Sequence, residues 1–232
     1  MPTVPSKPQI VAHRGLHVEF PENSTAAFRA ARDAGADWVE CDVHASFDGE
    51  PVIIHDETLD RSTMATGRVG DQRIQFLAET PLRGPGAEKW MHIPLLRDRD
   101  PRENLLVEIK PPDAAALVKK VMQFRSGGAW MIQSFDEANL HHALALDPGV
   151  PVAFLVEDRE SLDRGIANGW KNIHLCHDLL DEPTARRLRE GGIAIGVWTV
   201  NSAPDLRRVM ELGAAMIITD ELELAMQIRD EI

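Results

Sequence analysis

Carboxylates occupy two strand-like stretches of this sequence at positions where apolar side chains would be ordinary. Glu40 and Asp42 stand two residues apart in DWVECDV, and Glu108 stands in LLVEIK. Because side chains two apart share one face of a strand, Glu40 and Asp42 point the same way. Buried carboxylates without partners each cost several kcal/mol, and a divalent cation removes that cost. Carboxylate oxygens suit Mg²⁺ and Ca²⁺, so the three acids are candidate metal ligands.

A structural interpretation of the same acids is also open. Glu40 and Asp42 could face outward and pair with basic residues of helices, because E-x-D spacing alone is a weak signal. Glu108 could form an ion pair with Lys110, two residues further along the same strand face. The second acidic strand favours the metal site, in which Lys110 would hold an anionic substrate group against the cation.

Two of the nine histidines lie where predicted strands end. His13 and Arg14 stand in AHRG, and His55 closes PVIIH beside Asp56, a candidate to orient a histidine. A single histidine at a strand end is ordinarily a core residue, but two of them near a metal can divide general acid and base catalysis. Arg14 and the cation can neutralise charge on phosphate oxygens. The set predicts transfer at phosphorus and leaves open which histidine is the acid.

Apolar runs alternate with helical patterns along the chain. Several helical patterns begin at Asp, Asn or Ser, which cap helices, and end at Gly. This alternation implies parallel strands with right-handed crossovers, and eight units predict a closed (β/α)8 barrel, a TIM barrel, with its site at the C-terminal strand ends. An open doubly wound sheet is the rival, but no G-x-G-x-x-G turn follows the first strand. The strand runs are QIVAH, DWVECDV, LLVEI, AWMIQSF, PVAFLV, NIHLC, IAIGVWTV and AAMIIT, and the helical stretches span 23–35, 113–128, 136–149, 158–169, 181–192 and 202–214.

The alternation is interrupted once. The Asp48-Gly49 pair predicts a hairpin that folds PVIIHD back antiparallel to the preceding strand. Residues from about 59 to 104 show no clear alternation, apart from a short helix predicted near residues 75–79. An irregular segment of this length is usually functional. No linker or repeat divides the chain, so we predict a single domain over residues 1–232 that contains this insertion.

Charge and composition limit the partners of the chain. Its formal net charge is −12, which argues against nucleic acid, because phosphate backbones need a basic surface. No stretch approaches the roughly 18 apolar residues of a membrane span, and no signal-peptide core is visible. Cys41 and Cys176 are too few for a disulfide framework and are interpreted as buried apolar residues. We therefore expect a cytoplasmic protein without a membrane anchor; its oligomeric state stays open.

Motifs throughout the chain resemble those of one known family. They are AHRG, PENSTAAF, GADWVECDVHASFDGEPVIIHDETLDRST, GRVGD, LLVEIK, QSF, GVWTVN and GAAMIITD, in this order. Their combination is similar to the glycerophosphodiester phosphodiesterases, enzymes that release an alcohol from glycerophosphodiesters. The resemblance implies a TIM barrel with a small insertion after the second strand. It also implies hydrolysis to sn-glycerol 3-phosphate and an alcohol such as choline or ethanolamine.

The resemblance further implies a role for each matching residue. The family uses a divalent cation, here Mg²⁺ or Ca²⁺, and a small-molecule glycerophosphodiester as substrate. Two motifs depart from the family: the segment IPLLRDRDPRENLL is short and charged, and TDEL replaces T-D-x-P. Neither departure touches a catalytic position. The implied acid–base pair is His13 and His55, the implied substrate-binding residues are Arg14, Lys110 and Trp198, and the implied metal ligands are Glu40, Asp42 and Glu108.

Two other functions stay open on the sequence alone. A phospholipase-like lyase on the same barrel would use a hydroxyl of the substrate as nucleophile and form a cyclic phosphate. A catalytically inactive binding protein would require a broken motif, and each of the His, Glu and Asp positions of the family pattern is present.

Overall fold

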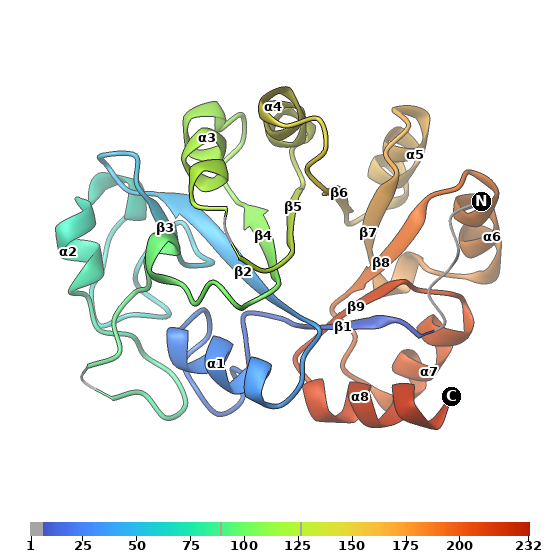
Figure 1. Cartoon of the computed structure of the whole chain (residues 1–232), viewed down its shortest axis with the longest axis horizontal. Helices are drawn as coiled ribbons and strands as arrows, with labels where there is room; N and C mark the ends of the chain where they lie inside the picture. The colour runs from blue at the N-terminus through green and yellow to red at the C-terminus, as the bar shows by residue number, and fades with distance from the viewer. Residues whose placement is uncertain (1–6, 89, 126) are drawn as a thin grey trace.

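Eight parallel strands close into a barrel, because β1 pairs with β2 on one side and with β9 on the other (Figure 1). The computed structural model describes residues 7–88, 90–125 and 127–232. The other strands pair with their neighbours in chain order, so the predicted TIM barrel is confirmed. The barrel strands are β1 (Gln9–Ala12), β2 (Trp38–Ala45), β4 (Leu105–Ile109), β5 (Trp130–Ser134), β6 (Val152–Val156), β7 (Asn172–Cys176), β8 (Ala194–Trp198) and β9 (Met216–Thr219).

Helices connect the strands and surround the barrel (Figure 1). Five of them begin at a capping side chain, from Ser24, Asp136, Asp158, Asp181 or Ser202, that accepts a hydrogen bond from a first-turn backbone N–H. Four of these capping residues are the first residues of predicted helical stretches, and Ser24 directly follows the first residue, Asn23, of the fifth. The surrounding helices are α1 (Thr25–Asp33), α3 (Ala115–Gln123), α4 (Glu137–Leu146), α5 (Arg159–Ala167), α6 (Glu182–Glu190), α7 (Ala203–Glu211) and α8 (Leu222–Glu231), and a 3₁₀ helix, η3 (His177–Leu179), precedes α6.

The last helix, α8, has no counterpart among the predicted helices. Its N-cap residue, Glu221, makes no side-chain capping hydrogen bond, so the usual start signal is missing. Leu222, Ala225 and Ile228 are buried in the apolar core, at a spacing of three residues that places them on one face of the helix. Packing of this face, rather than a capping residue, holds α8 in place.

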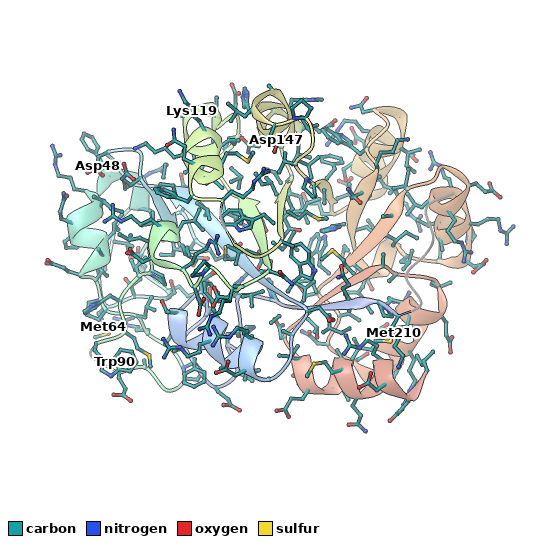
Figure 2. The ribbon with its side chains drawn as sticks, in the orientation of Figure 1. Asp48, Met64, Trp90, Lys119, Asp147 and Met210 are labelled. Carbon is teal, nitrogen blue, oxygen red and sulfur yellow. The ribbon has the colours of Figure 1, made fainter. Side chains whose placement is uncertain are left out.

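The predicted hairpin and insertion are both present. β3 (Pro51–Ile53) pairs antiparallel with β2, and Gly49 in the turn has φ 75°, a conformation that favours glycine. The insertion contains α2 (Ile74–Ala78), close to the predicted short helix, with the 3₁₀ helices η1 (Val69–Asp71) and η2 (Leu96–Asp98). The insertion builds its own apolar cluster, and the exposed Met64 and Trp90 lie at its outer edge (Figure 2). The single-domain organisation stays a prediction.

The two faces of β2 have different chemistry although both are buried. Val39 and Cys41 point into the apolar layer between barrel and helices. Trp38, on the other face, joins a separate apolar cluster with residues of β1, β4 and β9, which fills part of the barrel interior. Glu40 and Asp42 share the face of Trp38 and therefore point into the barrel. The alternative in which these acids face solvent is wrong.

Among the residues that the structure describes, no helix is long and apolar enough to cross a membrane. Cys41 is fully buried, Cys176 is half-buried, and both thiols are free.

Gly196 on β8 leaves space for a ring on the neighbouring strand. Its register partner is the buried His174 of β7, and a Cβ added at Gly196 would lie 2.1 Å from Cδ2 of that ring. Because the interior is filled, we expect Gly196→Ala to lower the free energy of unfolding by about 1–3 kcal/mol in urea titrations. The control, Gly149→Ala, adds a carbon 3.4 Å from Asp147 at an exposed turn and should change it by less than about 0.5 kcal/mol. Equal effects of the two substitutions would contradict this account.

Candidate active site

Three carboxylates meet inside the barrel. Asp42 on β2 and Glu108 on β4 are register partners, and Glu40 lies two residues before Asp42 on the same face. The exposed fractions of Glu40, Asp42 and Glu108 are only 1%, 1% and 8%. Each offers an oxygen, and these atoms lie within 4.8 Å of one another. The structure thus brings together the three predicted metal ligands.

Basic and amide groups partly compensate the three acids. The Lys110 ammonium lies 2.8 Å from Oε1 of Glu108 and 3.6 Å from Oδ1 of Asp42. Arg14 lies with Nε 3.2 Å from Oδ2 of Asp42, and its backbone N–H donates to Oε2 of Glu40. Asn23 donates from Nδ2 to Oδ2 of Asp42 at 2.8 Å. Both predicted phosphate-binding cations therefore border the acidic cluster.

The pKa values of the acids show that this compensation is incomplete. Burial, together with the charges of Asp42 and Glu108, raises the pKa of Glu40 well above its usual value. Burial and the Asp42 charge raise the pKa of Glu108 to about 7. Burial alone would raise the pKa of Asp42 too, but Arg14 and Lys110 outweigh it and lower the value. The residues present therefore do not stabilise three negative charges together.

The cluster fits a hard divalent cation. Oδ1 of Asp42 and Oε1 of Glu108 are buried and accept no hydrogen bond of good geometry from the described residues. Such oxygens, on three carboxylates within reach of one centre, are the donor set that Mg²⁺ and Ca²⁺ prefer. The same donor set accepts either ion, so the cluster does not fix the identity of the metal.

A carboxylate from the other end of the chain holds the His13 ring. Nδ1 of His13 lies 2.7 Å from Oδ1 of Asp220, which follows β9. Two residues after His13, the chain turns at Gly15 with φ 79°. A Cβ at Gly15 would lie 2.7 Å from the backbone carbonyl carbon of Ala27. The glycine of AHRG thus permits the close turn that follows the histidine. Because Nδ1 is held by Asp220, Nε2 is the ring nitrogen of His13 that can transfer a proton.

His55 is held in the same manner by its neighbour in the chain. Nδ1 of His55 lies 2.6 Å from Oδ1 of Asp56. Asp56 accepts two hydrogen bonds from Arg61 of the insertion, and Arg61 also donates to Glu22, which binds Arg14. Burial lowers the pKa of His55, which favours a neutral ring near pH 7. As with His13, Nε2 of His55 is the nitrogen left for chemistry.

A cavity of about 250 Å³ joins these groups. A second cavity, of about 800 Å³, adjoins it and shares His55 and Lys110 with it. Of the eight predicted site residues, only the deeply buried Asp42 does not line the smaller cavity. Its lining includes His13, Arg14, Glu40, His55, Glu108, Lys110 and Trp198, joined by Gln133, Phe135, Leu155, Glu157, Thr199 and Ile218.

Asp56, a predicted orienting residue, holds His55, but other residues that orient this set were not predicted from the sequence. Gln133 donates to Glu40 at 3.5 Å and bonds at 2.8 Å to Nδ1 of His174, whose backbone oxygen accepts from Nε1 of Trp198. Asp220 belongs to the same class of positioning residues. The motifs QSF and MIITD contain Gln133 and Asp220, but no feature of either motif connects it to a glutamate or a histidine far away in the chain.

The barrel and the charged cavity at the carboxyl ends of its strands are typical of a TIM-barrel enzyme. Residues 13–224 match the Glycerophosphoryl diester phosphodiesterase family, so the chain belongs to this family. It is a glycerophosphodiester phosphodiesterase, a phosphoric diester hydrolase.

Relatives match the chain over nearly its whole length. The glycerophosphodiester phosphodiesterase of Caldanaerobacter subterraneus is 27% identical, over 94% of this chain and 96% of the relative. The crystal structure of the Thermotoga maritima glycerophosphodiester phosphodiesterase is 26% identical, has a TM-score of 0.79 and covers 96% of this chain and 98% of its own. An Oleispira antarctica phosphodiesterase in complex with the product sn-glycerol-3-phosphate has a TM-score of 0.87 at 22% identity and covers 97% of each chain.

The buried His174 predicts a dependence of stability on pH. Burial lowers its pKa from the ordinary 6.5 to about 4, so the unfolded chain binds one proton more than the folded chain between these values. Stability contributed by neutral His174 is therefore complete above pH 6.5 and is lost as the pH falls toward 4, by up to about 3 kcal/mol. Chemical unfolding of wild type and His174→Gln from pH 7 to pH 4 measures the difference.

The variant should lose less stability than wild type over this range. His92→Gln, at an exposed histidine of the insertion, is the matched control and should follow the wild-type curve. If His174→Gln follows the wild-type curve as well, His174 is not the cause of the loss of stability at low pH.

Proposed function

We propose that this enzyme hydrolyses glycerophosphodiesters to sn-glycerol 3-phosphate and an alcohol in the 250 Å³ cavity. The observation that carries the proposal is the meeting of the buried acidic cluster, through Glu40 and Glu108, with two carboxylate-held histidines at that one cavity. The product named for the Oleispira antarctica enzyme supports the same chemistry. The cytoplasmic location stays a prediction of the sequence.

The charged residues would bind the phosphate. Glu40, Asp42 and Glu108 would hold a divalent cation, which supplies a Lewis acid for phosphate oxygens when it is bound. Arg14 and Lys110 border the same carboxylates and would neutralise charge on the remaining phosphate oxygens. Burial lowers the pKa of Lys110, but the nearby carboxylates Glu108 and Asp42 outweigh burial and raise it above the ordinary value. Lys110 therefore stays an ammonium ion in the site.

Trp198 would bind the glycerol moiety. Its indole nitrogen is fixed by the His174 carbonyl at 2.9 Å, and its ring meets Phe135 edge to face with 5.5 Å between ring centroids. The two rings form an apolar wall beside the charged half of the cavity. Carbon atoms of the substrate would contact this wall while its phosphate faces the acids and their cations.

His13 and His55 would divide the proton transfers. Each ring is fixed through Nδ1 by a carboxylate, so each presents Nε2 to the cavity. One histidine accepts the proton of the attacking oxygen, and the other gives a proton to the leaving alkoxide. The two rings are held alike, so pH–rate profiles of the single variants are the measurement that assigns the roles.

Replacement of either histidine tests the reaction. We expect His13→Gln and His55→Gln each to lower kcat/KM for glycerophosphocholine by about 10²- to 10⁴-fold, because each removes one proton transfer. Loss of the base should remove the acidic limb of the pH profile, and loss of the acid the alkaline limb. Phosphorus NMR should show sn-glycerol 3-phosphate as the product. Near wild-type rates in both variants, or a cyclic phosphate as end product, would refute the proposal.

The metal site has a separate test. EDTA should abolish turnover, and added Mg²⁺ or Ca²⁺ should restore it. The ion that restores turnover should also raise the melting temperature of the protein, because it relieves repulsion among the acids. We expect Glu108→Gln to weaken both effects. The control is Glu103→Gln, at a buried glutamate outside the cluster, which should keep the response of the wild type. Turnover that survives EDTA would rule out the cation.

A further inference from the structure

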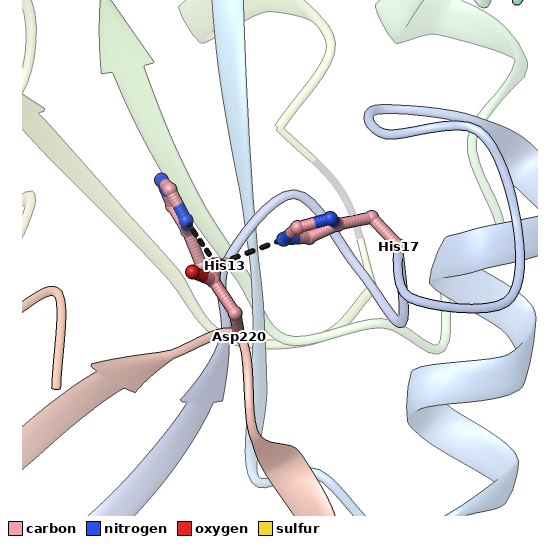
Figure 3. A group of neighbouring side chains, drawn as sticks. All are labelled: His13, His17 and Asp220. Atoms are coloured by element: carbon pink, nitrogen blue, oxygen red, sulfur yellow. Dashed lines mark hydrogen bonds and ion pairs between the residues drawn. The ribbon is translucent and has the colours of Figure 1, made fainter. Parts of the chain in front are cut away.

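Side chains able to bind a metal gather at a second place among the described residues. His13, His17 and Asp220 each offer an atom within 4.8 Å of the others. Nδ1 of His13 lies 2.7 Å and Nε2 of His17 lies 2.8 Å from the same oxygen, Oδ1 of Asp220. Figure 3 shows the two rings approaching this carboxylate from different sides. The three side chains come from the end of β1, the loop after it and the end of β9.

The arrangement differs from an ordinary histidine–carboxylate pair. His142 and Asp113 form such a pair on the surface, with one ring on one carboxylate. At Asp220 two rings share one oxygen, and their planes are 79° apart with centroids separated by 6.1 Å. The rings therefore direct nitrogen atoms to one point from two directions, as ligands of one ion do.

The Asp220 carboxylate is held in place by hydrogen bonds, and it and the two histidines are partly exposed to solvent. Asn201 donates to the other oxygen of Asp220, Oδ2, at 2.6 Å and accepts from the Asp220 backbone N–H. Burial alone would raise the pKa of Asp220, but hydrogen bonds from His13 and His17 bring it far below its usual value, so the group is ionised. The side chains of His13, His17 and Asp220 are 19%, 25% and 24% exposed.

We propose that His13, His17 and Asp220 form a binding site for Zn²⁺ or a similar transition-metal ion, separate from the acidic cluster, and that an ion bound there inhibits the enzyme. Two nitrogen atoms and one oxygen are a zinc donor set, with metal–ligand distances near 2.0–2.2 Å. A tetrahedral ion needs its donor atoms about 3.3 Å apart, so the two nitrogen–Oδ1 distances of 2.7 and 2.8 Å would lengthen by about half an ångström. Water completes the coordination.

Proton positions explain the inhibition. With the ion on Nδ1, the single ring proton of neutral His13 moves from Nδ1 to Nε2, and no proton is lost from the ring. His17 shifts its proton from Nε2 to Nδ1 in the same way. Nε2 of His13 then carries a proton that it does not exchange, so it neither accepts nor delivers one during the reaction. The inhibition, but not the binding, rests on the function proposed for His13.

The two cation sites select different ions. The cluster of Glu40, Asp42 and Glu108 offers only oxygen atoms, which suit Mg²⁺ and Ca²⁺. Imidazole nitrogen favours Zn²⁺, Co²⁺ and Ni²⁺. An excess of Mg²⁺ should therefore fill the acidic cluster and leave the histidine site free.

Binding is tested with the full chain in excess Mg²⁺. Co²⁺ serves as a visible probe, and a chromophoric chelator competes for Zn²⁺. Wild type should bind one ion with absorption bands of nitrogen-ligated Co²⁺. His17→Gln and Asp220→Asn should weaken binding roughly tenfold or more, because each removes one of three ligands. Glu108→Gln and the surface control His142→Gln should bind like wild type. Absence of the bands in wild type, or equal binding by His17→Gln, overturns the site.

Inhibition is measured for each variant as its rate with Zn²⁺ divided by its own rate without Zn²⁺. A change in basal activity therefore does not affect the comparison. Zn²⁺ should inhibit wild type in excess Mg²⁺, and His17→Gln should need at least about tenfold more Zn²⁺ for the same inhibition. Equal sensitivity would show that Zn²⁺ acts at the acidic cluster, and the inhibitory role would be wrong. Should the enzyme fail to hydrolyse glycerophosphodiesters, the Co²⁺ spectra still decide the site.

Discussion

The repulsion among three carboxylates in the barrel interior is the constraint on which the rest of the site depends. Glu40, Asp42 and Glu108 are fixed by two paired strands, so they cannot separate without breaking the sheet. Arg14 and Lys110 offset part of the repulsion, yet the pKa values of Glu40 and Glu108 stay raised. The proposed cation completes the compensation. The cost of the buried acids would thereby be linked to the binding of the ion that the proposed reaction uses.

Charge also connects the insertion to the barrel. Arg61 of the insertion donates hydrogen bonds to two carboxylates, Asp56 and Glu22. Asp56 holds His55, and Glu22 accepts a hydrogen bond from Arg14. One side chain therefore positions a proposed catalytic histidine and a proposed phosphate-binding arginine. Leu59, two residues before Arg61, is buried in the apolar cluster of the insertion, to which β3 and α2 also contribute. We infer that the irregular segment serves to support the site.

Local signals in the sequence were sufficient for most elements. Asp48-Gly49 specified the hairpin, because few residues other than glycine adopt the turn conformation. Asp or Ser at N-caps marked the starts of helices such as α5 and α7. The signal was absent at α8, where Glu221 forms no capping bond and only packing defines the helix. Predicting α8 needed the barrel wall against which Leu222 and Ile228 pack.

The sequence by itself predicted the barrel and the family and placed Glu40 and Asp42 on one face of a strand, because alternation along a strand and the order of motifs are properties of the chain; that this face points into the barrel was decided by the structure. Only the tertiary structure decided which groups hold the acids and histidines in place. His13 and Asp220 stand 207 residues apart, and Gln133 and Glu40 stand 93 apart. No local pattern records such pairs, since they meet only when β9 closes on β1 and the strand ends come together. Closure of the barrel converts separate motifs into one site.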